Sequence, residues 1–247
     1  MDVDEKQPFM SHLEELRKRL INCAISVGLG FIICYLFKEE LFKILMLPLK
    51  NQMPEGDRVI FTNLPEMFFT YIKTAFVGGI VISSPFIFHQ LWLFIAPGLY
   101  QHEKRYLIPF VLSSSLLFVS GTLFAYFVVF PFGFKFFLGF ANDYIQALPS
   151  VKQYFSFSIK LLLAFGLIFQ LPVVVFFISK MGLLGPDTLK RNRKYALLLI
   201  FVIAAILTPP DVITQFMMAG PLLILYEISI WVSAIASKGK AKDKEDE

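Results

Sequence analysis

Charged residues are scarce in this chain: Lys, Arg, Asp and Glu make up 17% of its 247 residues, whereas 56% are hydrophobic. A soluble domain usually carries about a quarter charged residues. Several apolar runs approach roughly 20 residues, the length that crosses a hydrocarbon core of about 30 Å. These runs do not alternate as the strands of a membrane barrel would. The composition therefore predicts an all-α polytopic membrane protein and argues against a soluble domain.

Cysteine and the residues of common catalytic motifs are also rare. The two cysteines, Cys23 and Cys34, lie in one predicted helix, about 16 Å apart along its axis, which is too far for a disulfide. No metal-ligand spacing links the three histidines, and the sequence has no HExxH, GxSxG or Walker A lysine motif. We expect no metal, no cofactor, no nucleic-acid partner and no enzymatic activity.

Six apolar segments are candidates for membrane spans. They cover about residues 20–37, 69–91, 107–130, 154–178, 195–207 and 213–236. An amphipathic segment (1–19) precedes them, and a charged tail (237–247) follows, for which we expect disorder. The fifth segment rises only about 20 Å and the sixth contains Pro221, so both look short and local thinning of the bilayer is expected. We treat residues 1–247 as one integral membrane domain.

The placement of positive charge predicts the orientation. Six spans put both termini on one side, and 14 of the 23 Lys and Arg residues lie on that side, against 6 on the other. Cytoplasmic loops carry the excess of positive charge. Both termini of this multi-pass protein are therefore expected in the cytoplasm.

Two acidic motifs share this cytoplasmic face. One is HLEELRKRL (residues 12–20), where Ser11 and Glu14 form a capping box that predicts a helix start. The other is WLFIAPGLYQHEKR (92–105), which contains Glu103. Two acidic elements on one face suggest a site for a basic ligand. For any single acid, the alternative is pairing with a nearby base or with the helix dipole.

Polar residues inside the apolar segments raise a second possibility. Gln170 and Glu227 lie within the fourth and sixth predicted spans, and such residues are functional-site hypotheses by default. A small-solute or ion secondary transporter would use such groups. The polar midspan residues are scattered, however, and no internal repeat is evident. The surface motifs favour a receptor.

Four motifs together resemble the TatC family, the multispanning component of the twin-arginine protein translocase. They are HLEELRKRL, LWLFIAPGLYQHEKR, AYFVVFPFGFKFF and LTPPDVITQ, and the resemblance covers about residues 7–236. It implies a receptor for the twin-arginine signal peptides of folded cargo proteins. It also implies TatA- and TatB-type single-span partners, other copies of the chain in a receptor complex, and export driven by the proton-motive force.

The resemblance assigns roles to particular residues. It implies signal-peptide binding by Glu15, Glu103, Arg17, Arg19, Phe94 and Leu99, docking of partner helices at Thr208 and Gln215, and structural importance for Pro48 and Pro85. Asp211 matches the acid of the last external loop, where a turn or capping role is the alternative. Gln170 departs from the family, because many members have Glu there and Gln cannot ionise near neutral pH.

Overall fold

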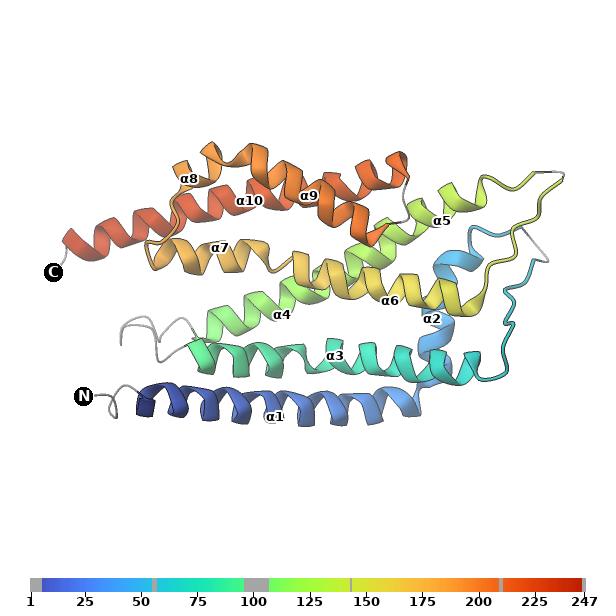
Figure 1. The fold of residues 1–247 in the computed structure, drawn as a ribbon, viewed down its shortest axis with the longest axis horizontal. Helices are drawn as coiled ribbons and strands as arrows, with labels where there is room; N and C mark the ends of the chain where they lie inside the picture. The colour runs from blue at the N-terminus through green and yellow to red at the C-terminus, as the bar shows by residue number, and fades with distance from the viewer. Residues whose placement is uncertain (1–5, 55–56, 96–106, 143, 209–210, 246–247) are drawn as a thin grey trace. The chain divides into compact units, whose positions relative to one another are not determined.

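The computed structural model describes residues 6–54, 57–95, 107–142, 144–208 and 211–245, most of which are helical (Figure 1). The all-α prediction is confirmed, since β-pairing in these ranges is limited to two isolated bridges. The chain forms two compact units. The first comprises Met1–Leu47, Val59–Leu116 and Pro149–Phe155, and the second comprises Pro48–Arg58, Leu117–Leu148 and Ser156–Glu247.

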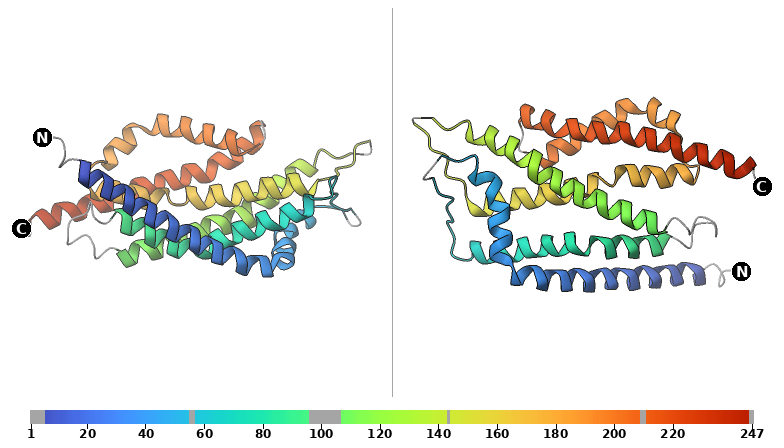
Figure 2. Two further views of the ribbon diagram at one scale, coloured as in Figure 1. Left: turned by 60° about the horizontal axis from the view of Figure 1, so that its bottom comes forward. Right: turned by 180° about the vertical axis from the view of Figure 1, so that it is seen from behind.

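In the first unit, α1 (Lys6–Leu36) and α3 (Glu66–Ile95) lie side by side (Figures 1 and 2). Their backbones approach closely at two glycines. A Cβ on Gly30 would lie 2.7 Å from the carbonyl oxygen of Gly79, and one on Gly79 would lie 2.6 Å from the nitrogen of Phe31. The Ser83 hydroxyl also donates a 2.8 Å hydrogen bond to the Ser26 carbonyl. Small residues of this kind let membrane helices pack through their backbones.

Two features of α1 and α3 differ from what simple sequence patterns suggest. One is the residue at which α1 begins, and the other is the continuation of α3 past a proline. Helix α1 begins at Lys6, so the prediction that a capping box at Ser11 starts it is wrong. Pro85 lies inside α3, which continues to Ile95. Pro48, which belongs to the second unit, is buried near the end of α2 (Lys38–Lys50).

Glu66 is the first residue of α3, and its side chain connects α3 to two other segments of the chain. Its side chain is buried, with 4% of the residue surface exposed. The carboxylate accepts hydrogen bonds from the backbone N–H groups of Thr62, Asn63 and Lys152, and from the hydroxyl of Ser150. One side chain thus joins the start of α3 to the segment before it and to the start of α6.

The second unit contains the remaining helices. They are the second part of α4 (Leu107–Phe124), the π-helix η3 (Ala125–Val129), α5 (Phe130–Leu138), most of α6 (Val151–Ile168), α7 (Leu171–Lys180), α8 (Pro186–Arg191), α9 (Arg193–Leu207) and α10 (Val212–Glu245). Helices α7 and α10 pack together, and the hydroxyl of Ser179 donates a 2.7 Å hydrogen bond to that of Ser233. A Cβ on Gly121 would lie 2.5 Å from the Phe165 carbonyl oxygen, so α4 and α6 also pack backbone to backbone.

Five of the six predicted spans are long and apolar enough to cross a membrane. They are His12–Leu36, Glu66–Ile95, Ile108–Leu138, Val151–Lys180 and Val212–Ser237. The remaining one is α9, whose 15 residues rise about 22 Å, so the prediction that this helix is short is confirmed. The prediction that the last helix is short is wrong. Helix α10 has 34 residues because it continues through Pro221 and does not end near it.

The fourth span is divided. Helix α6 ends at Ile168 and α7 begins at Leu171, with a turn at Phe169 and Gln170 between them. Pro172 lies at the start of α7, where the missing N–H of proline costs no hydrogen bond. Helix α10 continues to Glu245. It therefore extends into the charged tail, residues 237–247, for which the sequence predicts disorder.

Candidate functional site

Two of the predicted ligand-binding residues form an ion pair on α1. Glu15 and Arg19 are one helical turn apart, and Nη2 of Arg19 lies 3.2 Å from Oε1 of Glu15. Only 28% of the Glu15 side chain and 25% of the Arg19 side chain are exposed. Half-buried charges of this kind need partners that hold them in place.

The second partner of Arg19 comes from α3. Nη1 of Arg19 donates a 3.3 Å hydrogen bond to Oε1 of Gln90, whose side chain is buried. The Arg19 guanidinium thus connects α1 to α3 and fixes the position of Glu15. Gln90 is not among the site residues predicted from the sequence, although a polar amide inside an apolar run is a signal of a functional residue.

An aromatic pair lies at the same end of these two helices. The ring of His12 stacks on that of Phe94, with centroids 4.5 Å apart. Arg17 is exposed on α1. The structure therefore brings Glu15, Arg19 and Phe94 to the same end of the α1–α3 pair. Glu103 and Leu99 lie outside the described residues.

The Glu15 carboxylate retains binding capacity. Its Oε1 is engaged by Arg19, whereas Oε2 accepts no hydrogen bond from the residues that the structure describes. A carboxylate offers about four lone-pair sites. The arrangement can accept a further cationic donor without losing the internal pair.

The turn between α9 and α10 holds three more predicted residues. Asp211 caps α10, because its carboxylate oxygens accept the N–H groups of Ile213 at 2.9 Å and Thr214 at 3.1 Å. The Thr214 hydroxyl, together with these N–H groups, holds the pKa of the Asp211 carboxyl below its usual range. The sequence leaves open whether Asp211 caps a helix or contacts a partner, and the structure shows that it caps α10.

Thr208 and Gln215 secure the end of α9. The buried Thr208 hydroxyl donates to the Ala204 carbonyl at 2.9 Å, and the amide of Gln215 reaches from α10 to the Phe201 carbonyl at 3.0 Å. Thr208 therefore satisfies a carbonyl at the end of α9, and Gln215 joins α10 to α9. Their docking of partner helices stays a prediction.

The polar residues of the fourth and sixth spans have local partners. Gln170 is buried and donates a long 3.5 Å hydrogen bond to the Gly166 carbonyl. Glu227 is half exposed and pairs with Arg193, the first residue of α9, at 2.7 Å. Glu227 thus fastens α10 to the start of α9.

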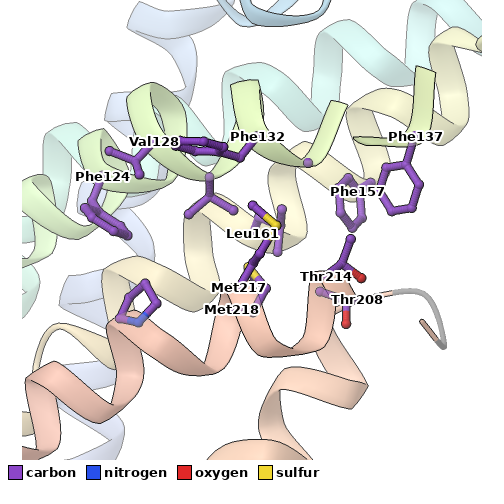
Figure 3. A pocket seen from close by; sticks show the side chains of 13 residues that line it. Phe124, Val128, Phe132, Phe137, Phe157, Leu161, Thr208, Thr214, Met217 and Met218 are labelled. Atoms are coloured by element: carbon purple, nitrogen blue, oxygen red, sulfur yellow. The ribbon is translucent and has the colours of Figure 1, made fainter. Parts of the chain in front are cut away.

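An apolar groove lies within the second unit (Figure 3). Phe124 and Val128 line it near η3, and Thr208 and Thr214 lie near Phe157 at one end. A π-helix such as η3 is rare and frequently marks a functional site. The groove has apolar walls and offers no array of charged groups to a polar solute.

The sequence profile of the family described as "Sec-independent protein translocase protein (TatC)" matches residues 11–221. The chain belongs to the TatC family. The TatC of Desulforapulum autotrophicum is 53% identical over 98% of this chain and 90% of its own length. That of Escherichia coli K12 is 41% identical over 100% of this chain and 95% of its own length.

Solved TatC structures have the same fold. A crystal structure described as "Twin Arginine Translocase Receptor- TatC" is 45% identical and covers 92% of this chain and 99% of its own, with a TM-score of 0.81. A second, in DDM, is 44% identical, with 90% and 99% coverage and a TM-score of 0.82. TatC is a membrane component of a protein translocase and not an enzyme family, so the expectation of no enzymatic activity is confirmed.

Proposed function

We propose that this chain is the receptor subunit of a twin-arginine translocase and binds the signal peptides of folded cargo at the cytoplasmic face of the inner membrane. Membership of the TatC family and similarity to a 45% identical crystal structure of a twin-arginine translocase receptor support this proposal. The observation that carries it is the Glu15 carboxylate, held by Arg19 against α3 with one oxygen unengaged by the described residues.

The chemistry of the ligand explains why carboxylates are needed. A guanidinium presents a planar fork of donors that a carboxylate meets with two parallel hydrogen bonds, and lysine does not reproduce this geometry. Two arginines need two such acceptors. Glu15 supplies one from α1, and Glu103 supplies the other from the segment after α3. Phe94 and Leu99 contribute apolar contact beside them, and Arg17 adds a positive charge to this face.

The remaining parts of the proposal concern assembly. Single-span partners of the TatA and TatB type dock at the α9–α10 hairpin, near Thr208 and Gln215, where Ile206 and Phe216 expose apolar surface. Other copies of the chain complete the receptor complex, and the proton-motive force drives export. Both termini lie in the cytoplasm, as the positive charge predicts.

Peptide binding to the purified protein in nanodiscs tests the receptor role. A signal peptide with two arginines is compared with one in which both are lysine. Each charge-assisted hydrogen bond contributes roughly 1.5–3 kcal/mol, so we expect the native protein to prefer the arginine peptide by about 10- to 1000-fold. Glu15→Gln and Glu103→Gln should each remove most of this preference.

Glu14 provides the matched control, because it is the neighbouring acid on α1 and is exposed. Glu14→Gln removes the same charge from the same helix and should leave the preference unchanged. Equal binding of the two peptides by the native protein would contradict the proposal. An equal loss in all three variants would show that net charge, and not a specific site, governs binding.

A further inference from the structure

Lys160 is a cation inside a membrane-spanning segment, and the proposed function does not use it. It lies on α6, nine residues after Val151, within the candidate span Val151–Lys180. Its ammonium group donates a hydrogen bond to the carbonyl oxygen of Ile206, on α9. Lysines in membrane segments are costly and rare, so this contact calls for a physical reason.

The end of α9 supplies that reason. The last four carbonyl groups of a helix have no partner within it, and in α9 these begin at Ala204. The Ala204 carbonyl accepts from both the N–H and the hydroxyl of Thr208. The Ile206 carbonyl accepts from Lys160, which lies in the same unit of the chain. A positive charge at this position also complements the negative end of the helix dipole.

The length of α9 makes such a cap necessary. Its 15 residues rise about 22 Å, whereas the hydrocarbon core measures about 30 Å. In a bilayer of this thickness, a helix of this length that starts at one surface ends before it reaches the other. Water does not reach unsatisfied carbonyls in hydrocarbon, where each one costs several kcal/mol.

We propose that Lys160 is a positioning residue that caps α9 within the membrane and sets the depth at which the α9–α10 turn lies. Asp211 and the start of α10 follow this cap directly. The depth of Thr208 and Gln215, on either side of the turn, is fixed with it. Only the consequence for partner docking rests on the proposed function. The capping role is independent of peptide binding.

The depth of the turn is measurable in the full-length protein in nanodiscs. Cys23 and Cys34 are first replaced by alanine, and a single cysteine is introduced by Ile213→Cys, at a position that is 56% exposed. The rate of reaction with a membrane-impermeant maleimide then reports access from water. In Lys160→Met the uncapped carbonyls move toward water, and we expect labelling roughly fivefold faster, the scale of a helix-terminal charge interaction. Lys160→Arg keeps the charge and should retain the native rate.

A reference cysteine, Leu64→Cys, lies in the segment before α3 at a position that is 93% exposed. Its labelling should not differ among the variants. Lys160→Gln provides a milder neutral change and should give an intermediate rate at position 213. Native rates in both neutral variants would overturn the proposal, as would an increase in Lys160→Arg equal to that in Lys160→Met. Equal changes at positions 64 and 213 would also overturn it, because they indicate a general disturbance.

Discussion

The backbone N–H of Lys152 donates a 2.6 Å hydrogen bond to Oε1 of Glu66, a residue 86 positions earlier in the chain. Four further groups donate to the same carboxylate, namely the N–H groups of Thr62 and Asn63 and the hydroxyls of Thr62 and Ser150. In Glu66→Gln one oxygen becomes an NH₂ group, which faces donors and cannot accept from them. We expect the melting temperature in detergent to fall by about 5 °C.

Exposed acids on α2 provide the control for Glu66. Glu39→Gln and Glu40→Gln remove the same charge from the first turn of that helix and should shift the melting temperature little. Faster hydrogen exchange at the Lys152 amide is expected only in Glu66→Gln. An unchanged melting temperature in Glu66→Gln would mean that the carboxylate does not hold these segments together.

The backbone contact between α1 and α3 predicts a sharp difference between two glycines. A Cβ on Gly79 would meet the Phe31 nitrogen at 2.6 Å, and backbone cannot move aside as a side chain does. Gly79→Ala should destabilise the protein by roughly 1–3 kcal/mol. Gly28→Ala, on α1, should be tolerated, because nothing lies within 4 Å of its Cβ position. Thermal unfolding of both variants in the same detergent tests this prediction. Equal stability of Gly79→Ala and Gly28→Ala would show that α1 and α3 can move apart to accommodate the added methyl group.

Substitutions of Gln90 should either lower or raise the affinity of the site for a twin-arginine peptide. Gln90→Leu removes one acceptor of Arg19, so the guanidinium turns fully to Glu15 and competes with a peptide arginine. Gln90→Glu gives Arg19 a second carboxylate and releases Glu15. We expect the affinity for a twin-arginine peptide to fall roughly three- to tenfold in the first variant and to rise by a similar factor in the second. Titration with labelled peptide measures both, and shifts of the same sign would exclude competition by Arg19.

The cap on α10 should make stability depend on pH. Hydrogen bonds from Thr214 and Ile213 lower the pKa of Asp211 in the folded protein, so its contribution is present above the ordinary aspartate pKa and is lost as the pH falls through the folded value. Asp211→Ala should lower the melting temperature by roughly 2–4 °C at pH 7. The difference from the native protein should shrink below about pH 4. Asp187→Ala, at an exposed site in the first turn of α8, should show no such change, and a constant difference in Asp211→Ala would argue against an ionised cap.

The sequence predicts those features that depend on composition along one helix. Apolar length identifies the spans, and the few residues before Thr208 identify α9 as short. No single segment of the sequence shows which faces of the helices pack against one another. Arg19 shows an obvious partner in Glu15 one turn away, but its second partner, Gln90, becomes visible only when α1 and α3 pack at Gly30 and Gly79. The hydrogen bonds of Glu66 are not predicted for the same reason, because their donors lie in two separate stretches of the chain, residues 62–63 and 150–152.

Helix α9 is joined to α10 at two places, at its first residue by the pair of Arg193 with Glu227 and near its middle by the hydrogen bond from Gln215 to the Phe201 carbonyl. The two helices therefore form a preorganised hairpin whose exposed surface exists before any ligand arrives. A helix that binds there spends little of its binding free energy on ordering the receptor. Loss of the Arg193–Glu227 pair would lower the affinity of such a helix without removing any residue proposed to contact it.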